Sequence, residues 1–493
     1  MQNNIPFFSF SQPLARWAVP ATLAGALLMA GCSHTSSYDS HSAAVLLPGQ
    51  WAGAAAVSSS GHSQAPLSQW WQAFGDAQMT ALIAQALQAN PSVQTAQAAL
   101  RQARAQLTVS EASGLPSAGA SLGASRSKRA SSEASSSFNA GIDAGWEPDF
   151  WGTQANAVRA SQANLEAAVA TLEGTHVSLA AEVALNYIEL RSLQNRLRIA
   201  QENLAIQREN EQITQWRVQA GLATSLDAQQ ARQSTAQTQA QIPALQSSLT
   251  QAQHALSILT GQVPTALVAQ LQAPQPVPVA GDALALALPV DTLRQRPDVR
   301  AQELRVTAAV ANLSAQERAN FPSLRLSGSV GVSAATLAAL GSSGASLASS
   351  IAASLSQTLF DGGANQARIQ ERQAAVEIAR INYRTSVLSA LQEVEDALAQ
   401  LRGDQERLQH LLVAEEAARY AQLLANQRYS SGLVDFQTVL DTQRTLLSSQ
   451  DSVATVQAAI STDHVRLYKA LGGGWTPLNL EGQPASTAAP VQP

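Results

Sequence analysis

The strongest constraint on the fold is an internal duplication. The pattern Asn90–Val93 followed by Leu115–Pro116 returns 206 residues later as Arg296–Val299 followed by Phe321–Pro322. An Ala- and Gln-rich stretch with helical character separates the two parts each time. Length alone would suggest about three domains for 493 residues. A fixed internal repeat instead indicates two copies of one architecture.

Each copy then enters a very long helical pattern. The pattern begins after a corner of Asp, Phe and Gly, at residues 149–152 in the first copy and 360–363 in the second. The two patterns, 152–220 and 363–431, are both 69 residues long, and a straight helix of that length measures roughly 100 Å. Apolar residues keep a strict seven-residue period along both patterns, which favours left-handed coiled-coil contact with neighbouring helices. The seam positions are Leu165, Val169, Leu172, Leu179, Val183, Leu190, Leu193, Leu197, Ala200 and Leu204 in the first copy, interrupted by His176 and Asn186, and Val387, Leu391, Val394, Leu398, Leu401, Leu408 and Leu412 in the second, interrupted by Gln405.

Between the helical stretches the hydrophobic period changes to two. Four such runs lie near residues 117–125, 137–147, 323–332 and 347–359. Their length of roughly nine to eleven residues, with apolar positions alternating with Ser, Gly and Asn, is typical of transmembrane β-strands. A half-buried sheet of a soluble protein gives the same alternation and remains an alternative.

Four strands per chain have a consequence for assembly. No expected helix is apolar enough to cross a bilayer, and an open sheet edge cannot exist in lipid because its backbone groups would be unpaired. Two chains would supply eight strands, whose interior side chains fill the barrel, whereas three would supply twelve and begin to leave a bore. Oligomerisation is therefore expected, and conduction favours at least three chains.

The N-terminal residues resemble those of a bacterial lipoprotein. Cys32, the single cysteine, follows Leu28–Gly31 in the manner of a lipobox, and residues 17–30 form an apolar run that is too short to span a bilayer. The resemblance implies cleavage before Cys32, a covalent lipid on Cys32 and, because Ser33 follows, sorting to the outer membrane. One lipid chain binds a membrane only weakly, so further membrane contact is expected. We expect no other cofactor.

These observations divide the chain into six parts. They are a signal peptide at 1–31, a lipidated tether at 32–66, a first repeat at 67–262, a Pro-rich linker at 263–291, a second repeat at 292–473 and a flexible tail at 474–493.

Several functions are disfavoured by the residues present. The net charge of −5 gives no basic surface for nucleic acid. Gly119–Gly123 fits the G-x-S-x-G pattern of hydrolases, but it lies within an expected strand with no helix directly after it, as a nucleophile elbow requires. The seven histidines are scattered and show no zinc-ligand spacing. We therefore expect neither an enzyme nor a metal protein.

Several separate motifs carry a resemblance to one family. They are Trp70-Trp71-x-x-Phe74-x-Asp76, Trp146–Gly152, Arg296–Asp298, Phe321–Ser323, Leu359–Gly363 and Leu471–Trp475. Together they resemble the outer membrane factor, or TolC-like, efflux family, in its lipoprotein branch associated with resistance-nodulation-division pumps. The resemblance implies a mainly α-helical homotrimer with a membrane β-barrel part. Its twelve-stranded barrel would continue into a periplasmic coiled-coil barrel of twelve helices, and each chain would be a tandem structural repeat.

The same resemblance implies where the functional residues lie. The turns of the two helical hairpins, at Gly221 and Leu222 and at Gly432 and Leu433, would contact the periplasmic adaptor. A periplasmic gate would be formed by Tyr429, Asp435, Asp441 and Arg444, where threefold symmetry makes rings of carboxylates that favour cations. Gln437 stands where some lipoprotein relatives have an apolar plug residue. The alternative is that these are solvated charges at helix ends.

The leading hypothesis is therefore a passive exit duct for small molecules in a tripartite efflux pump. It would lie in the outer membrane, extend into the periplasm, and take its energy from a partner pump and adaptor in the inner membrane. The same fold could serve a type I polypeptide secretion system. A rival of a different class is a non-conducting periplasmic coiled-coil scaffold.

Overall fold

The computed structural model describes residues 67–128, 130, 133–280, 293, 295–480 and 482–483. The expected signal peptide, Cys32 and the tether lie outside the described residues. So do residues 281–291 of the expected linker, residues 292 and 294 of the second repeat, and residues 481 and 484–493 of the expected tail.

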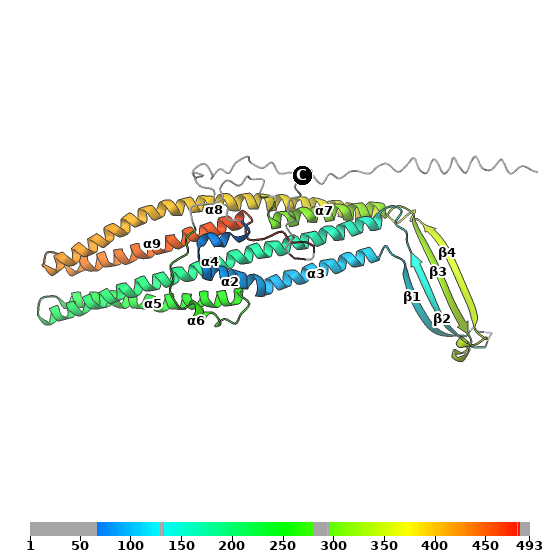
Figure 1. The fold of residues 1–493 in the computed structure, drawn as a ribbon, viewed down its shortest axis with the longest axis horizontal. Coiled ribbons are helices and arrows are strands. Elements are labelled where there is room, and N and C mark those ends of the chain that lie inside the picture. The colour runs from blue at the N-terminus through cyan, green and yellow to red at the C-terminus, as the bar shows by residue number, and fades with distance from the viewer. Residues whose placement is uncertain are drawn as a thin grey trace, which may run out of the picture. The chain divides into compact units, whose positions relative to one another are not determined.

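The described part of the chain consists of two similar sets of elements (Figure 1). The first set is η4 (Leu67–Phe74), α2 (Ala77–Ala89), α3 (Pro91–Ala112), β1 (Ser117–Ser127), β2 (Ser135–Trp146), α4 (Thr153–Gln219) and α5 (Ser225–Leu259). After the short α6 (Val268–Leu271), the second set is α7 (Pro297–Arg318), β3 (Ser323–Ala334), η6 (Leu337–Gly341), β4 (Ser346–Ser356), α8 (Ala364–Ser430) and α9 (Phe436–Ala470). Helices α3 and α7 have 22 residues each, α4 and α8 have 67, and α5 and α9 have 35. The equal lengths confirm the duplication.

The corners of Asp, Phe and Gly explain where the two long helices begin. Gly152 and Gly363 precede α4 and α8 with φ of 78° and 89°, a left-handed conformation that glycine adopts at little cost. The Asp149 carboxylate accepts a hydrogen bond of 2.7 Å from the amide of Ala155, and Asp361 accepts one of 2.7 Å from the amide of Asn365. Each corner aspartate thereby satisfies a helix N-terminal donor that has no partner within the helix.

The four strands form one antiparallel sheet in the order β1-β2-β3-β4. Its register places the apolar residues of neighbouring strands on one face, as in the row Ala144, Gly328 and Ile351, and the polar residues on the other, as in the row Asp143, Ser329 and Ser350. Strand β4 ends at Ser356 although the alternation extends to Leu359, because Ser356 pairs with Ser323, the first residue of β3, and no partner lies beyond it. Within the described residues, β1 and β4 are the edges of this sheet.

Helix α4 forms the centre of the main core. It packs on α2, α3, α5, α7 and α9 (Figure 1), and its middle is buried on several sides, with Tyr187, Ile188 and Leu190 almost completely inaccessible. The expected seam of α4 lies in this core from Leu165 to Leu193, and Ala200 and Leu204 are buried beyond it. The seam of α8 is buried as far as Leu401, but Leu412 is 43% exposed. Among the helices within the described residues, none combines the length and apolar character needed to cross a bilayer.

The sequence predicts a flexible tail from residue 474 onward, and this prediction is wrong for the residues just after Gly474. The amide of Leu478 donates a hydrogen bond of 2.9 Å to the buried carboxylate of Glu173 on α4, and Arg104 on α3 donates to the carbonyl of Leu480. The cause is a buried acceptor that local sequence does not reveal: Glu173 is inaccessible to solvent, and the tail supplies an amide to it. Burial raises the pKa of Glu173, although the Leu478 amide and Arg300 oppose this shift.

Candidate functional site at the two helix turns

Both long hairpins turn back through the same backbone motif. Gly221 has φ of 71° and Gly432 has φ of 75°, conformations that favour glycine. The amide of Leu222 bonds the carbonyl of Arg217 at 2.8 Å, and the amide of Leu433 bonds that of Arg428 at 2.9 Å. These are the hydrogen bonds of a Schellman motif, which satisfies the last carbonyls of each helix.

The side chains after the two glycines point to solvent. Leu222 and Leu433 are each 73% exposed. The turns are thus rigid in the backbone but carry a large apolar side chain that has little contact within the chain. An exposed apolar group held in a fixed position is suited to contact with another protein.

Each returning helix starts with a side-chain cap. On α5, Thr224 accepts from the amide of Asp227 and the Asp227 carboxylate accepts from Thr224, which forms a capping box. On α9, Asp435 accepts a hydrogen bond of 3.0 Å from the amide of Thr438. The hydroxyl and amide of Thr438 hold the pKa of Asp435 below its ordinary value. Asp435 therefore remains negatively charged, and it is exposed at the turn.

Tyr429 joins the turn of the first hairpin to that of the second. Its ring lies 5.3 Å from that of Phe436 on α9, and the Arg217 guanidinium at the end of α4 lies 4.6 Å from the centre of the Tyr429 ring. Ala231 of α5 belongs to the small apolar cluster that contains Phe436. The two hairpins of one chain are therefore held together at their turns by an aromatic pair and a cation–π contact.

Asp441 and Arg444 are neighbours on the first turns of α9. Arg444 Nη1 lies 3.9 Å from Asp441 Oδ1, and the Gln437 side chain donates a hydrogen bond of 2.9 Å to the same oxygen. The Arg444 and Asp441 side chains are 43% and 59% exposed. An ion pair of this kind is held weakly because water screens it, so the pair can exchange partners if another charged group approaches.

The structure therefore places all four candidate gate residues near one hairpin turn but uses them differently. Asp441 pairs with Arg444, Tyr429 packs on Phe436, and Asp435 caps α9. Arg217 was not anticipated. The duplication contains a signal for this residue, because Arg217 and Arg428 stand at the same position before the glycine of each turn.

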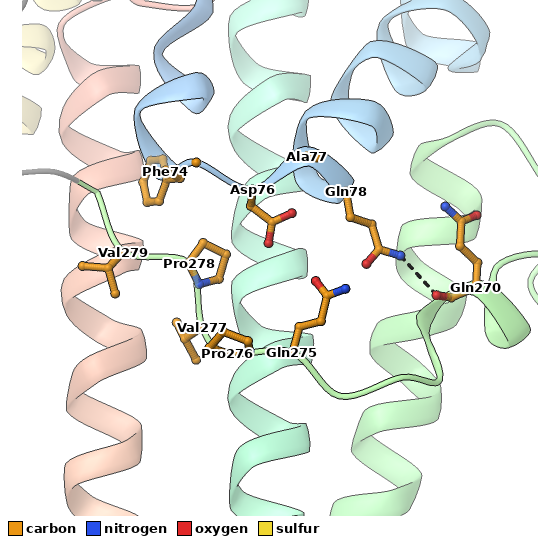
Figure 2. Close-up of a pocket in the computed structure, with 11 residues that line it drawn as sticks. Phe74, Asp76, Ala77, Gln78, Gln270, Gln275, Pro276, Val277, Pro278 and Val279 are labelled. Carbon is orange, nitrogen blue, oxygen red and sulfur yellow. Dashed lines mark hydrogen bonds between the residues drawn. The ribbon is translucent and has the colours of Figure 1, made fainter.

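A pocket of about 770 Å³ lies away from the turns, between the start of α2 and the extended segment 275–279 (Figure 2). Gln78 crosses it to donate a hydrogen bond of 3.1 Å to the carbonyl of Gln270. Behind Gln78, the buried Arg191 donates to the Gln78 side chain and to the Tyr187 hydroxyl, and Tyr187 donates to Asp76. This network ties the linker region to α2 and α4, which is a structural role.

The described residues give no support to a hydrolase site or to a metal site. Gly119–Gly123 lies inside β1, which is followed by β2 rather than by a helix, so the backbone does not form a nucleophile elbow. His176 is partly buried on α4, and burial lowers its pKa. Within the described residues there is no group of three or more His, Cys, Asp or Glu side chains arranged to hold a metal ion.

A tandem repeat of strand pairs and long helical hairpins, with exposed leucines at rigid turns, defines a chain of the outer membrane channel class. The family model described as "Outer membrane efflux protein" matches residues 82–262 and 288–473. The chain belongs to this family.

Individual relatives agree with this assignment. The chain is 32% identical to the pyoverdine export outer membrane protein OpmQ of Pseudomonas aeruginosa, over 92% of this chain and 96% of the relative. It is 29% identical to nodulation protein T of Rhizobium leguminosarum bv. viciae, over 86% and 88%. Among solved structures, the outer-membrane channel OprN is similar with a TM-score of 0.78 at 35% identity, covering 83% of this chain and 93% of that one.

Proposed function

We propose that this protein is the outer membrane channel of a tripartite efflux pump, a passive exit duct for small molecules. The observation that carries the proposal is the four-stranded sheet with two unpaired edges, joined to two 67-residue helices in a chain of the efflux family. Relatives are named for the export of toluene, solvents and pyoverdine. In this role the chain does no covalent chemistry and needs no cofactor other than a lipid on Cys32.

The assembly we propose is a homotrimer. Unpaired strand edges cannot stand in lipid, and three chains bring twelve strands, enough to leave a bore. The turns at Gly221 and Leu222 and at Gly432 and Leu433 would contact a periplasmic adaptor, which joins the channel to an inner membrane pump. Their exposed leucines support this placement.

We also propose that Tyr429, Asp435, Asp441 and Arg444 form the periplasmic gate. In a trimer each aspartate becomes a ring of three carboxylates, which attracts cations and repels anions. The exposed Asp441–Arg444 pair can exchange partners between chains, and the contact between Arg217 and Tyr429 would hold the hairpins of one chain together while the gate is closed.

A planar bilayer tests the duct and the gate together. Purified, acylated protein should insert and conduct, with reversal potentials that show cation preference. Asp441→Ala should raise conductance and weaken that preference, whereas Asp396→Ala, a change of an exposed aspartate on α8 far from the turns, should alter neither. Absence of any conductance would refute the duct and favour a scaffold. Conductance unaffected by Asp441→Ala would remove this residue from the gate.

Lipidation and subunit number need separate measurements. Labelled palmitate should be incorporated by the wild-type protein and not by a Cys32→Ala variant. Chemical cross-linking in detergent should give a ladder that stops at three subunits; a ladder ending at one or two would contradict the trimer.

A further inference from the structure

Two aspartates are buried opposite each other in the packing between α8 and α9. Asp404 on α8 is 6% exposed and Asp463 on α9 is 1% exposed. The two carboxyl groups lie within hydrogen-bonding reach of each other. Helix α8 ends at Ser430 and α9 begins at Phe436, so the two aspartates are almost equally far from the turn and occupy the same level of the hairpin. This is the hairpin whose turn carries the candidate gate.

The surroundings of the pair are apolar on both helices. Leu401 lies one turn before Asp404, and Ile460 and Leu467 lie one turn on either side of Asp463. Leu401 and Leu467 belong to the same apolar cluster, and Ile460 packs against it. Charged groups are disfavoured in such an environment unless they are paired and hydrogen-bonded.

The available partners do not neutralise both carboxylates. Arg466 Nη1 is 3.2 Å from Asp463 Oδ1 and Arg407 Nη1 is 3.8 Å from Asp404 Oδ1, but the two arginine side chains are 58% and 61% exposed and are screened by water. The Gln400 amide donates a hydrogen bond of 3.0 Å to Asp404. Among the described residues, no donor reaches Oδ2 of Asp463.

Helix α4, which also packs on α9, brings no further charge to the pair. The contacts of Arg196 with Asp451 and of Asn203 with Gln450 set an antiparallel register that places residues 184–190 of α4 opposite Asp463. The charged residues in or beside this stretch are Glu182 and Glu189, which are exposed, and Arg191, whose guanidinium donates to Gln194 and Gln78.

The remaining neighbours of the hairpin do not reach the pair either. Helix α7 meets α8 near Glu393 and farther from the turn, so it does not extend to Asp404. Helix α5 meets α9 near the turn, in the apolar cluster of Ala231 and Phe436. His464 follows Asp463 on α9 and is 7% exposed, so the substitutions of the two aspartates, rather than the pH dependence alone, assign the effect to the pair.

We propose that Asp404 and Asp463 form a proton-binding site that locks α8 against α9 when one proton is shared between the two carboxyl groups. Two ionised carboxylates cannot hydrogen-bond each other, because neither has a proton to donate. One added proton converts a repulsive contact into a hydrogen bond. It does so at a buried pair in which Oδ2 of Asp463 has no hydrogen-bond partner. The ligand of this site is the proton itself.

The direction of the pH dependence follows from the same environment. Burial raises the pKa of Asp463 to about 6, with the Asp404 charge contributing and Arg466 opposing. A raised pKa means that the packed hairpin binds the proton more tightly than an opened one does. The locked state is therefore favoured in acid and is lost as pH rises through about 6.

Hydrogen–deuterium exchange measured at pH 5 and pH 7.5 tests the site without requiring channel activity. After correction for the intrinsic exchange rate, peptides that cover residues 398–408 and 457–467 should be about tenfold more protected at pH 5, from a pKa of about 6 in the packed hairpin and 3.8 in the opened one. Peptides from α4 serve as the internal reference. Equal protection at the two pH values in the wild-type protein would overturn the proposal.

Substitutions identify the groups responsible. Asn has the shape of a protonated Asp, so Asp463→Asn and Asp404→Asn should each keep the high protection at both pH values. Asp396→Asn makes the same change at an exposed position of α8 and should behave as the wild type. Persistence of the pH dependence in Asp463→Asn and Asp404→Asn would show that another group is responsible and would refute the assignment.

Discussion

Arg296 is the residue whose removal should loosen the most contacts at once. Its guanidinium bonds Asp298 through two nitrogens at 3.1 and 2.8 Å, Glu393 of α8 at 2.7 Å and the carbonyl of Ala470 at the end of α9 at 2.6 Å. The Arg296 side chain is only 7% exposed. The start of α7, the middle of α8 and the end of α9 are thus joined by one side chain.

The structure limits the size of the effect. Removing one partner of a buried ion pair costs about 3–5 kcal/mol when the remaining charge stays buried. Here Asp298 and Glu393 are 52% and 53% exposed, so water can solvate both after the loss. The Ala470 carbonyl would lose its hydrogen-bond donor in a buried position, and an unsatisfied buried acceptor costs about 1–3 kcal/mol. We therefore expect Arg296→Ala to destabilise the protein by about 3 kcal/mol.

Thermal unfolding followed by circular dichroism at 222 nm measures this effect in detergent. Arg296→Ala should lower the midpoint by several degrees, and Arg296→Lys should be intermediate because it keeps the charge but loses the two-pronged geometry. Arg198→Ala is the matched control, since the contacts of Arg198 with Glu202 and Asn195 are exposed and their loss should change the midpoint little. Equal shifts for Arg296→Ala and Arg198→Ala would refute the reasoning.

The contribution of the Arg296–Asp298 ion pair to stability can also be tested through its pH dependence. Burial opposes the ionisation of Asp298, but the Arg296 hydrogen bonds and charge outweigh it, so the pKa of Asp298 lies below its ordinary value of 3.8. A lowered pKa stabilises the fold above the ordinary value, and this stabilisation disappears as pH falls through the pKa in the folded state. The difference between wild type and Arg296→Ala should therefore shrink in acid below about pH 4. A constant difference from pH 7 to pH 3 would assign the effect to packing alone.

Three further changes test other parts of the fold. Ile351→Arg, on the apolar face of β4, should cost ~2–4 kcal/mol if that face meets lipid, whereas Ser350→Arg on the opposite face should leave oligomer yield on a native gel unchanged; equal losses would reverse the assignment of faces. Gly261→Ala should lower the unfolding midpoint, because Gly261 has φ of 73° and a Cβ there would lie 2.5 Å from the Ala89 carbonyl oxygen; an unchanged midpoint would show that the turn can shift. Trp70 is 1% exposed and stacked on a tyrosine of α9, so Trp70→Ala should lower the free energy of unfolding by about 3–5 kcal/mol. A loss of less than about 1 kcal/mol, measured by urea unfolding, would contradict this.

Local signals account for the parts of the fold that could be predicted from the sequence. The long helices start and stop at glycines with positive φ, and the corner aspartates cap them, so their limits were readable to within a residue. The strands could be predicted from the alternation of apolar and polar residues, because successive side chains of a strand point to opposite faces of the sheet. The end of β4 could not be read in this way, since it depends on where the partner strand begins.

The contacts that were missed all join residues far apart in the chain. Arg217 meets Tyr429, Asp404 meets Asp463, and Leu478 meets Glu173 across 305 residues. Each polar member looks like a solvated surface group in its own helix, because periodicity assigns an apolar stripe but cannot say what covers the rest of the helix. Burial of these groups is decided by packing with other elements, which a single sequence does not reveal.

The two copies have equal element lengths but unequal surroundings, and this difference bears on assembly. Helix α4 is covered by five other helices of its own chain, whereas α8 packs mainly on α7 and α9. Val413 and Tyr420, seven residues apart on α8, are 67% and 61% exposed. An apolar stripe at heptad spacing requires a partner helix, and the unpaired edges of β1 and β4 require partner strands. One chain leaves both kinds of surface open, and the proposed closed ring of identical chains would cover them together. The smallest ring that meets the proposal is the one whose strand number first leaves a bore.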